Sequence, residues 1–313
     1  MKHALITGGA GFIGSYLARF LLDDGYKVTV VDNLSNGSEE NIPKGCNFIN
    51  IDIATEHWVD LLDPSIDYVF HLAAQSSGEI SFEDPENDLK INTLGTLTLL
   101  NWSLNNGIKK FIFTSSMNVY GQVEDRMISE KDYINPDSFY AVGKVASENY
   151  MRIYSDLGLN ITVLRLFNVY GPGQNLHNLK QGMISIYCAY MHNNDPILVK
   201  GSLNRFRDFV YITDVIDAIS QSMHHDLNFL ILNVCTGVKT TVGDVISMMR
   251  SSSSKSDYPI IVLDGTPRDQ FGIYGNPSLA KTLIGWESKI NIRDGIENMI
   301  QWIDNLDKGT YNE

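Results

Sequence analysis

Residues 7–14 read Thr-Gly-Gly-Ala-Gly-Phe-Ile-Gly and place three glycines, Gly8, Gly11 and Gly14, at intervals of three. They follow the apolar run Lys2–Ile6, which is typical of a buried strand, and they open a helix that we expect over residues 12–23. A turn this tight lets a pyrophosphate lie against main-chain amides at the start of the helix, where the helix dipole favours negative charge. A plain strand-to-helix connection uses glycines in the same way, so the function of this turn depends on the residues that follow.

The second expected strand ends in an acidic residue. Residues 27–31 form an apolar run, and Asp32 follows them, about 20 residues beyond the glycines. Folds that bind dinucleotides place an acid at this point, where it accepts hydrogen bonds from the adenosine ribose hydroxyls. A carboxylate here also repels a 2′-phosphate, so Asp32 favours NAD over NADP.

Strands and helices alternate through the first half of the chain. Further strands are expected at residues 47–51, 66–71 and 109–114, and a long amphipathic helix at residues 88–106. This repeated winding predicts an α/β fold, with a doubly wound parallel sheet of the Rossmann type and helices on both faces. The small residues after position 71 allow a ligand to approach the backbone closely.

A tyrosine and a lysine, Tyr140 and Lys144, lie four positions apart on one expected helix. Residues at this spacing share a helix face, so a proton carrier stands beside a cation. An ammonium group stabilises a nearby phenolate and lowers the tyrosine pKa from about 10, which would make Tyr140 a usable general base or acid. The pair alone is a weak signal, since many helices carry both residues.

Ser116 is the hydroxyl residue that completes this group. It lies in Thr114–Gly121, at the carboxyl end of the strand expected at residues 109–114. Ligands of open parallel sheets bind outside the carboxyl ends of the strands, so a hydroxyl there can reach a substrate oxygen. A strand-to-loop transition that satisfies its own backbone through hydroxyl side chains is the alternative explanation.

Composition limits the classes of function. The 313 residues are 43% hydrophobic and 19% charged, which suits one large domain with a smaller one. A net charge of −13 gives no general attraction for nucleic acid or for an anionic membrane surface. The seven histidines and three cysteines show no metal-ligand spacing, so we expect no metal.

The apolar runs predict a protein of the cytoplasm. They are strand length, well below the ~20 residues that span a bilayer, and the first strand begins near residue 2, which leaves no room for a signal peptide. An odd number of cysteines, three, also suits a reducing compartment better than a disulfide framework. We therefore expect no membrane segment and a cytoplasmic location.

Taken together, these motifs resemble those of the extended short-chain dehydrogenase/reductase family, in its NAD-dependent nucleotide-sugar epimerase/dehydratase branch. The chain is most similar to UDP-glucose 4-epimerase-like enzymes, and the likeness covers nearly its whole length. The matching stretches are Thr7–Gly14, Asp32–Leu34, Asp52–Ile53, His71–Ala74, Asn92–Thr96, Ser116–Gly121, Tyr140–Lys144, Arg165–Pro172 and Arg207–Val215.

The resemblance implies a role for each matching residue. Tyr140 is then the catalytic base, Lys144 binds the nicotinamide ribose and tunes the tyrosine, and Ser116 hydrogen-bonds the reacting sugar hydroxyl. Residues implied to line NAD, besides Tyr140 and Lys144, are Gly8, Gly11, Phe12, Ile13, Gly14, Asp32, Asn33, Asp52, Ile53, Leu72, Ala73, Ala74 and Asn92. For Asp52 a helix N-cap is an equally good explanation.

The second half loses the regular alternation, as a substrate-binding part would. We expect an NAD-binding Rossmann domain at residues 1–170, with a returning strand near 229–235, and a smaller C-terminal α/β domain for the nucleotide sugar at 171–313. The resemblance implies that Asn168, Gln181, Arg207 and Arg268 bind the substrate. Arg268 stands where the family usually has glycine, so its phosphate contact is in doubt. A homodimer is expected by analogy.

The resemblance implies epimerisation at C4 of a nucleotide-diphosphate hexose through a transient 4-keto sugar. Related dehydratases carry an Asp-Glu pair just after the catalytic hydroxyl, and related decarboxylating enzymes carry a glutamate there, whereas this chain has Met117 and Asn118. A reductase of nucleotide-linked 4-keto sugars that uses NAD(P)H is the main alternative. A non-catalytic NAD-binding regulator is a further one, since fold alone does not establish activity.

Overall fold

The computed structural model describes residues 1–225, 227–253, 257–265 and 270–306. A seven-stranded sheet, parallel throughout, runs through its larger part, with the strand order β12-β7-β5-β4-β1-β2-β3. Its strands are β1 (His3–Thr7), β2 (Lys27–Asp32), β3 (Asn47–Asn50), β4 (Tyr68–His71), β5 (Lys110–Ser116), β7 (Ile161–Leu166) and β12 (Phe229–Val234). The doubly wound α/β fold is thereby confirmed.

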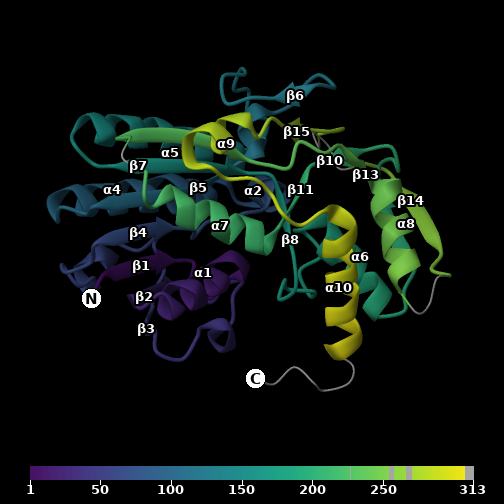
Figure 1. The fold of residues 1–313 in the computed structure, drawn as a ribbon, viewed down its shortest axis with the longest axis horizontal. Coiled ribbons are helices and arrows are strands. Elements are labelled where there is room, and N and C mark those ends of the chain that lie inside the picture. The colour runs from purple at the N-terminus through teal and green to yellow at the C-terminus, as the bar shows by residue number, and fades with distance from the viewer. Residues whose placement is uncertain (226, 254–256, 266–269, 307–313) are drawn as a thin grey trace.

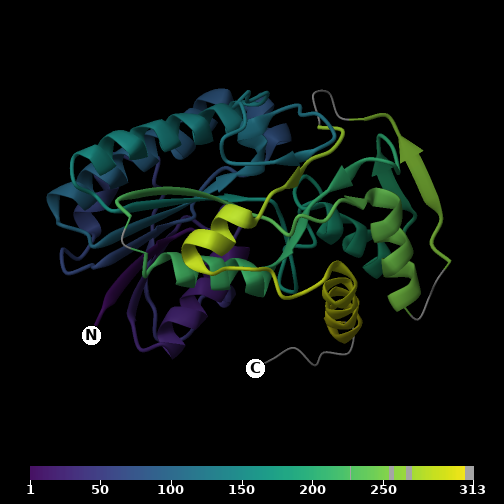
Figure 2. The same cartoon turned by 45° about the horizontal axis from the view of Figure 1, so that its top comes forward.

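Helices cover both faces of this sheet (Figures 1 and 2). One face packs against α1 (Phe12–Asp23) and α7 (Ile212–Ser222), and the other against α4 (Thr96–Asn105) and α5 (Phe139–Asp156). Successive residues of a strand point to opposite faces, so β1 sends Ile6 to the first core and Leu5 to the second. Both faces are therefore buried, as a parallel sheet requires.

The strand β12 returns from the second half of the chain to the edge of the large sheet, where it pairs with β7 from Phe229↔Ile161 to Val234↔Leu166. The division into domains at residue 170 stays a prediction. Segments between β7 and β12, together with much of the chain after β12, leave the sheet and build the part that faces its carboxyl edge, at the right of Figure 1.

That second part consists of helices and short two-stranded sheets. Its helices are α6 (Met183–His192), α8 (Val242–Ser252) and α10 (Ile292–Leu306), whereas α9 (Ser278–Ile284) packs against β12 of the large sheet. The strand pairs are β8 (Asn168–Tyr170) with β11 (Phe209–Tyr211), β9 (Ile197–Lys200) with β14 (Ile260–Leu263), β10 (Phe206–Arg207) with β13 (Thr240–Thr241), and β6 (Met127–Ile128) with β15 (Tyr274–Gly275).

The helix expected at residues 88–106 is divided in the structure. A short helix α3 (Pro85–Leu89) leads into a π-helical segment, Lys90–Gly95, and only then into α4. The widened turn carries Asn92, whose amide Nδ2 donates to Gln75 O at 2.9 Å and to Asp88 Oδ2 at 3.0 Å. π-helical turns of this kind are frequent at functional sites. Periodicity alone gave the extent of the helical region but not this interruption.

Candidate active site

A cavity of about 1580 Å³ lies between the carboxyl edge of the large sheet and the second part of the chain. Pockets for single small molecules are usually about 300–1,000 Å³, so this one has room for a dinucleotide and a further ligand. One end is lined by the glycine turn and Asp32, and the other by residues such as Tyr190 and Arg207. We call these the cofactor end and the substrate end.

The glycine turn forms a main-chain cradle at the cofactor end. Gly11 is the N-cap of α1, and within the described part of the chain no side chain caps that helix start. Gly8 has a φ of +75°, and a Cβ there would lie 2.7 Å from Ala73 N, so only glycine allows β1 and the segment after β4 to approach this closely. The first amides of α1 are thus left for an anionic ligand.

The polar side chains beside the cradle are held in place by their own backbone. Asp32 Oδ2 accepts from Ala10 N at 3.0 Å, and Asp32 Oδ1 accepts from Leu34 N at 2.8 Å. Asn33 Nδ2 donates to Asp52 Oδ2 at 2.9 Å, while Asp52 Oδ1 accepts from Ala54 N at 2.8 Å. Both carboxylates therefore line the cavity in fixed orientations.

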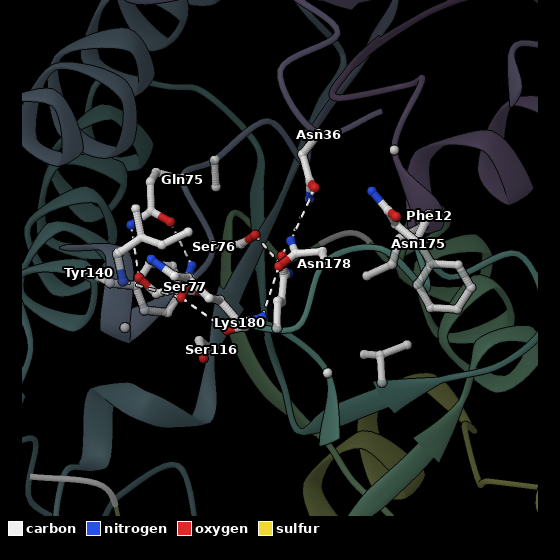
Figure 3. Close-up of a pocket in the computed structure, with 18 of the residues that line it drawn as sticks. Phe12, Asn36, Gln75, Ser76, Ser77, Ser116, Tyr140, Asn175, Asn178 and Lys180 are labelled. Carbon is white, nitrogen blue, oxygen red and sulfur yellow. Dashed lines mark hydrogen bonds between the residues drawn. The ribbon is translucent and has the colours of Figure 1, made fainter. Parts of the chain in front are cut away.

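Ser116, Tyr140 and Lys144 line the same cavity, and Figure 3 shows Ser116 and Tyr140 close together in its wall. Ser116 ends β5, and α5 begins just before Tyr140 because Ser138 Oγ caps it by accepting from Ala141 N at 3.2 Å. A hydrogen bond with Ser116 favours the Tyr140 phenolate. The sequence predicted that these three residues lie together, because Ser116 follows a strand end and Tyr140 and Lys144 share one face of a helix.

The pKa of Tyr140 is raised in the structure, whereas the sequence predicted that Lys144 would lower it. Burial, together with the charge of Asp88, raises the pKa of Tyr140 to about 12, although the Ser116 hydrogen bond acts in the opposite sense. Burial lowers the pKa of Lys144 to about 8. The Lys144 ammonium donates to Thr114 O at 2.9 Å and lies 5.8 Å from the Tyr140 ring centroid. It is thus bound to β5 rather than to the phenol.

The substrate end holds three of the four residues expected there, namely Asn168, Gln181 and Arg207. Arg207 is 4% exposed and donates to Phe206 O at 2.8 Å, Gln270 O at 2.8 Å and Phe271 O at 3.2 Å. It joins β10 to the segment at residues 270–271. The fourth residue, Arg268, lies outside the described residues.

Asn92 is the one described residue of the expected NAD set that does not line the cavity. Its side chain is buried behind the wall, where Nδ2 holds the backbone of Gln75. All the others line it, namely Gly8, Gly11, Phe12, Ile13, Gly14, Asp32, Asn33, Asp52, Ile53, Leu72, Ala73, Ala74, Tyr140 and Lys144.

Comparison with known proteins identifies the family of this chain. The profile of the NAD dependent epimerase/dehydratase family matches residues 4–235. The chain belongs to that family. It is 33% identical to a putative UDP-glucose 4-epimerase of Methanocaldococcus jannaschii, over 96% of this chain and 98% of that one.

Solved structures of the family agree with the fold described above. The UDP-glucose 4-epimerase of Thermotoga maritima with UDP-glucose has a TM-score of 0.92 and 33% identity, covering 97% of this chain and 99% of its own. The UDP-glucose 4-epimerase of Thermus thermophilus in complex with NAD has a TM-score of 0.90 and 32% identity, covering 96% and 99%. Each is a likeness over nearly the full length of both chains.

The cofactor of this family member is NAD. The cradle fits its pyrophosphate, since uncapped amides of α1 face a cavity in which glycines leave room for the ligand. Asp32 offers a carboxylate for ribose hydroxyls, and that negative charge opposes a 2′-phosphate. The residues at this end thus suit NAD in shape and in charge.

A segment that we call the strap, residues 173–182, lines the cavity with the expected Gln181 and with residues that sequence reasoning missed, namely Gly173, Gln174, Asn175, Asn178, Leu179, Lys180 and Gly182. Asn178 Nδ2 donates to Asn36 Oδ1 at 3.1 Å, Gln181 Nε2 donates to Ser76 Oγ at 2.7 Å, and Ser77 Oγ donates to Lys180 O at 3.2 Å (Figure 3). Ser76 and Ser77, which hold the strap, lie in the polar run after β4. That run could have been recognised as part of the cavity, because it follows a strand end.

Within the described ranges, no helix is both long and apolar enough to cross a membrane. No three His, Cys, Asp or Glu side chains among the described residues lie together as a metal site requires.

Proposed function

We propose that this enzyme inverts the configuration at C4 of the hexose in a uridine diphosphate sugar, of the UDP-glucose/UDP-galactose type, through a transient 4-keto intermediate. The observation that carries the proposal is the meeting of Ser116, Tyr140 and Lys144 in one cavity with no carboxylate at the next two positions, Met117 and Asn118. The names of the relatives support uridine diphosphate as the carrier.

Each residue of the trio has a distinct part in this reaction. NAD supplies the hydride acceptor when it is bound. Tyr140 takes the proton of the sugar 4-hydroxyl, and Ser116 hydrogen-bonds the same oxygen so that the proton has a defined path. The Lys144 ammonium, which Thr114 O holds 5.8 Å from the Tyr140 ring centroid, would bind the nicotinamide ribose, the role that the family resemblance implies for it. The reverse proton transfer completes the second half of the cycle.

The positions after Ser116 argue against loss of water or carbon dioxide. Met117 is 8% exposed, and the Asn168 amide lies 3.3 Å from its sulfur. Asn118 contributes its backbone N–H to Ser116 Oγ at 3.2 Å. Elimination at C5 and C6 needs an acid and a base there, and neither a thioether nor an amide serves. Return of the hydride needs no such group.

A 4-keto-sugar reductase would use the same trio but would consume reduced cofactor, commonly NADPH. Asp32 disfavours that cofactor, because its carboxylate, which two backbone amides fix, would repel a 2′-phosphate if it binds the adenosine ribose as we propose. The Asp32 carboxylate therefore favours a reaction in which one bound NAD accepts the hydride and returns it.

The test is a panel of UDP-glucose, UDP-galactose, their N-acetyl analogues and UDP-glucuronic acid, followed by mass spectrometry and sugar analysis. Interconversion of two C4 epimers, with no mass change and no added NADH or NADPH, supports the proposal. A product lighter by one water or one carbon dioxide would overturn it, as would a strict need for stoichiometric reduced cofactor. Tyr140→Phe, which keeps the ring but lacks the proton acceptor, is the negative control.

We also propose that the enzyme acts as a homodimer. Apolar side chains from α3 to α5 are exposed on one side of the sheet, including Leu89 at 58%, Ile153 at 53% and Leu157 at 61%. A surface of this kind suits a second copy of the chain. Light scattering after gel filtration tests it, with Ile153→Asp expected to give a monomer. The cytoplasmic location stays a prediction.

A further inference from the structure

Asp88 is a buried acid for which the proposed reaction has no role. It lies in α3, just before the π-helical segment, and its side chain is 1% exposed. Asp88 Oδ2 accepts from Gln75 Nε2 at 2.9 Å and from Asn92 Nδ2 at 3.0 Å. Both donors are neutral amides, so among the described residues this carboxylate makes hydrogen bonds but no ion pair within 4.0 Å.

The carboxylate lies directly behind the catalytic helix. A Cβ on Gly143, which stands between Tyr140 and Lys144 in α5, would be 3.4 Å from Asp88 Oδ1 and 3.1 Å from Asn92 Cβ. A side chain at position 143 would press on Asn92 and Asp88, so the glycine lets α5 lie close to α3. Asp88 is therefore fixed against the backbone that carries both Tyr140 and Lys144.

The same carboxylate also reaches the cavity wall. Gln75 lines the cavity, and besides donating to Asp88 it donates to Ser77 O at 2.9 Å and accepts from Ser77 N at 2.7 Å. Ser77 in turn contacts the strap through Lys180 O. One buried oxygen of Asp88 thus fixes the loop that faces Ser116 and Tyr140 in Figure 3.

The other charges near Lys144 leave Asp88 as its main counter-charge. The titratable groups that act on Lys144 or face it are Asp88 from α3, Tyr140 and Glu148 from α5 itself, and His71 from β4. His71 is buried, which lowers its pKa to about 3 and keeps it neutral. Glu148 is already paired with Arg165, at 2.6 Å from Nη2 to Oε2 and 3.0 Å from Nε to Oε1. A paired carboxylate has a weak field at a distance.

We propose that Asp88 is a positioning residue for the Tyr140–Lys144 pair, whose buried carboxylate supplies the fixed negative charge behind Lys144 and anchors Gln75 in the cavity wall. This rests on the proposed function only for its kinetic consequence. Burial lowers the pKa of Lys144, and Asp88 acts in the opposite sense, so it keeps the ammonium charged near neutral pH. It also raises the pKa of Tyr140.

The first experiment measures charge directly and needs no substrate. The protein is labelled with 13C at lysine Cε, and the Lys144 signal is assigned by its loss in Lys144→Met. In Asp88→Asn the pKa of Lys144 should fall by about one unit, because a nearby counter-charge has been removed. An unchanged titration in a folded Asp88→Asn protein would overturn the proposal. Glu86→Gln, which removes an exposed charge from the same helix, should leave the titration unchanged.

The second experiment needs no substitution at Asp88, so it stands even if Asp88→Asn does not fold. Coupling between two charges is reciprocal. Burial raises the pKa of Asp88, and the Lys144 ammonium opposes that rise. In Lys144→Met the carboxyl 13C signal of Asp88 should therefore titrate at higher pH than in the wild type. Equal titration of Asp88 in the two proteins would contradict the proposed pairing.

The third experiment uses turnover of the sugar found by the panel. Loss of the Asp88 charge lowers the pKa of both Tyr140 and Lys144, so both limbs of the pH profile of kcat/KM should move to lower pH. A lower rate with unmoved limbs would mean that Asp88 only supports the fold. If no sugar is turned over, the proposed reaction fails while the two titrations still decide the role of Asp88.

Discussion

The cofactor end and the substrate end of the cavity are built in different ways. At the cofactor end, the contact groups are main-chain amides of α1 and carboxylates held by amides only a few residues away or on the adjoining turn, as for Asp32 with Leu34. At the substrate end, Arg207 is held by carbonyls more than 60 residues further along the chain, at Gln270 and Phe271. The carboxylates of the cofactor end are held within 22 residues along the chain, as Asp32 is by Ala10, whereas Arg207 at the substrate end is held by a carbonyl 63 residues away.

The difference teaches which substitutions should affect chemistry, fold or binding. A local site loses only the group that is removed, because its backbone is already fixed by the sheet and by α1. A site held by remote segments loses their arrangement as well. Substitutions at the centre, the cofactor end, the substrate end and the strap should therefore differ in kind as well as in size.

The largest effect is expected at the centre, where both ends meet. Tyr140→Phe should lower kcat by about 10³-fold, the usual scale for loss of a general base, while NAD binding and thermal stability stay near wild type. Steady-state kinetics, NAD titration and thermal unfolding measure the three quantities. Tyr133→Phe is the control, because Tyr133 is 83% exposed. Near-normal turnover in Tyr140→Phe would remove Tyr140 from the mechanism.

The next effect tests the substrate end. Arg207→Ala should lower kcat/KM by about 100-fold and also lower the melting temperature, because each buried carbonyl left without a donor costs about 1–3 kcal/mol. Arg207→Lys, which keeps the charge but not the planar fork of donors, should fall between Ala and wild type. A normal melting temperature in Arg207→Ala would show that this end is as local as the other.

At the cofactor end the expected change is in binding preference alone. Asp32→Asn should raise the affinity for NADP relative to NAD by about tenfold, which corresponds to about 1.4 kcal/mol, because the repulsive charge is gone while the backbone hydrogen bonds are largely kept. Fluorescence titration of cofactor-free protein gives both constants. Asp24→Asn, an exposed change just after α1, is the control. An unaltered preference would place the Asp32 carboxylate away from the ribose.

The smallest effect concerns the strap, which joins the two ends. Asn36→Ala removes the hydrogen bonds with Asn178 and Gln181, both at the surface, each worth about 0.5–1.5 kcal/mol at most. Release of NAD, followed by stopped flow, should become about threefold faster, with kcat little changed. Release at the wild-type rate would mean that the strap does not restrain the cofactor.

Many helices and strands could be predicted from the sequence, because their hydrophobic patterns match the faces that the fold buries. The helix expected at residues 12–23 coincides with α1, and the strands expected near residues 27, 47 and 110 are β2, β3 and β5. Hydrophobic periodicity fixes such elements when both faces of a sheet are buried. The π-helical segment was missed, since its turn depends on Asn92 reaching Gln75, a contact across two elements.

The candidate site divides in the same manner. The glycine turn, Asp32, Ser116, Tyr140 and Lys144 were identifiable because each follows a strand end or shares a helix turn, and a parallel sheet gathers strand ends at one edge. The strap and the contact of Asp88 with α5 gave no local signal. Their partners are distant in the chain, so no spacing rule could bring them together.

By itself the sequence determined a parallel sheet wound on both faces, a glycine cradle with an acid beside it, and a Tyr-Lys pair on one helix. Tertiary structure decided the pKa values of that pair. Packing against β5 and α3 buries Tyr140 and Lys144, and it places Asp88 behind their helix. The reason is physical. Hydrophobic pattern and turn chemistry act over a few residues, whereas burial and the field of a charge depend on every segment that excludes water from the same place.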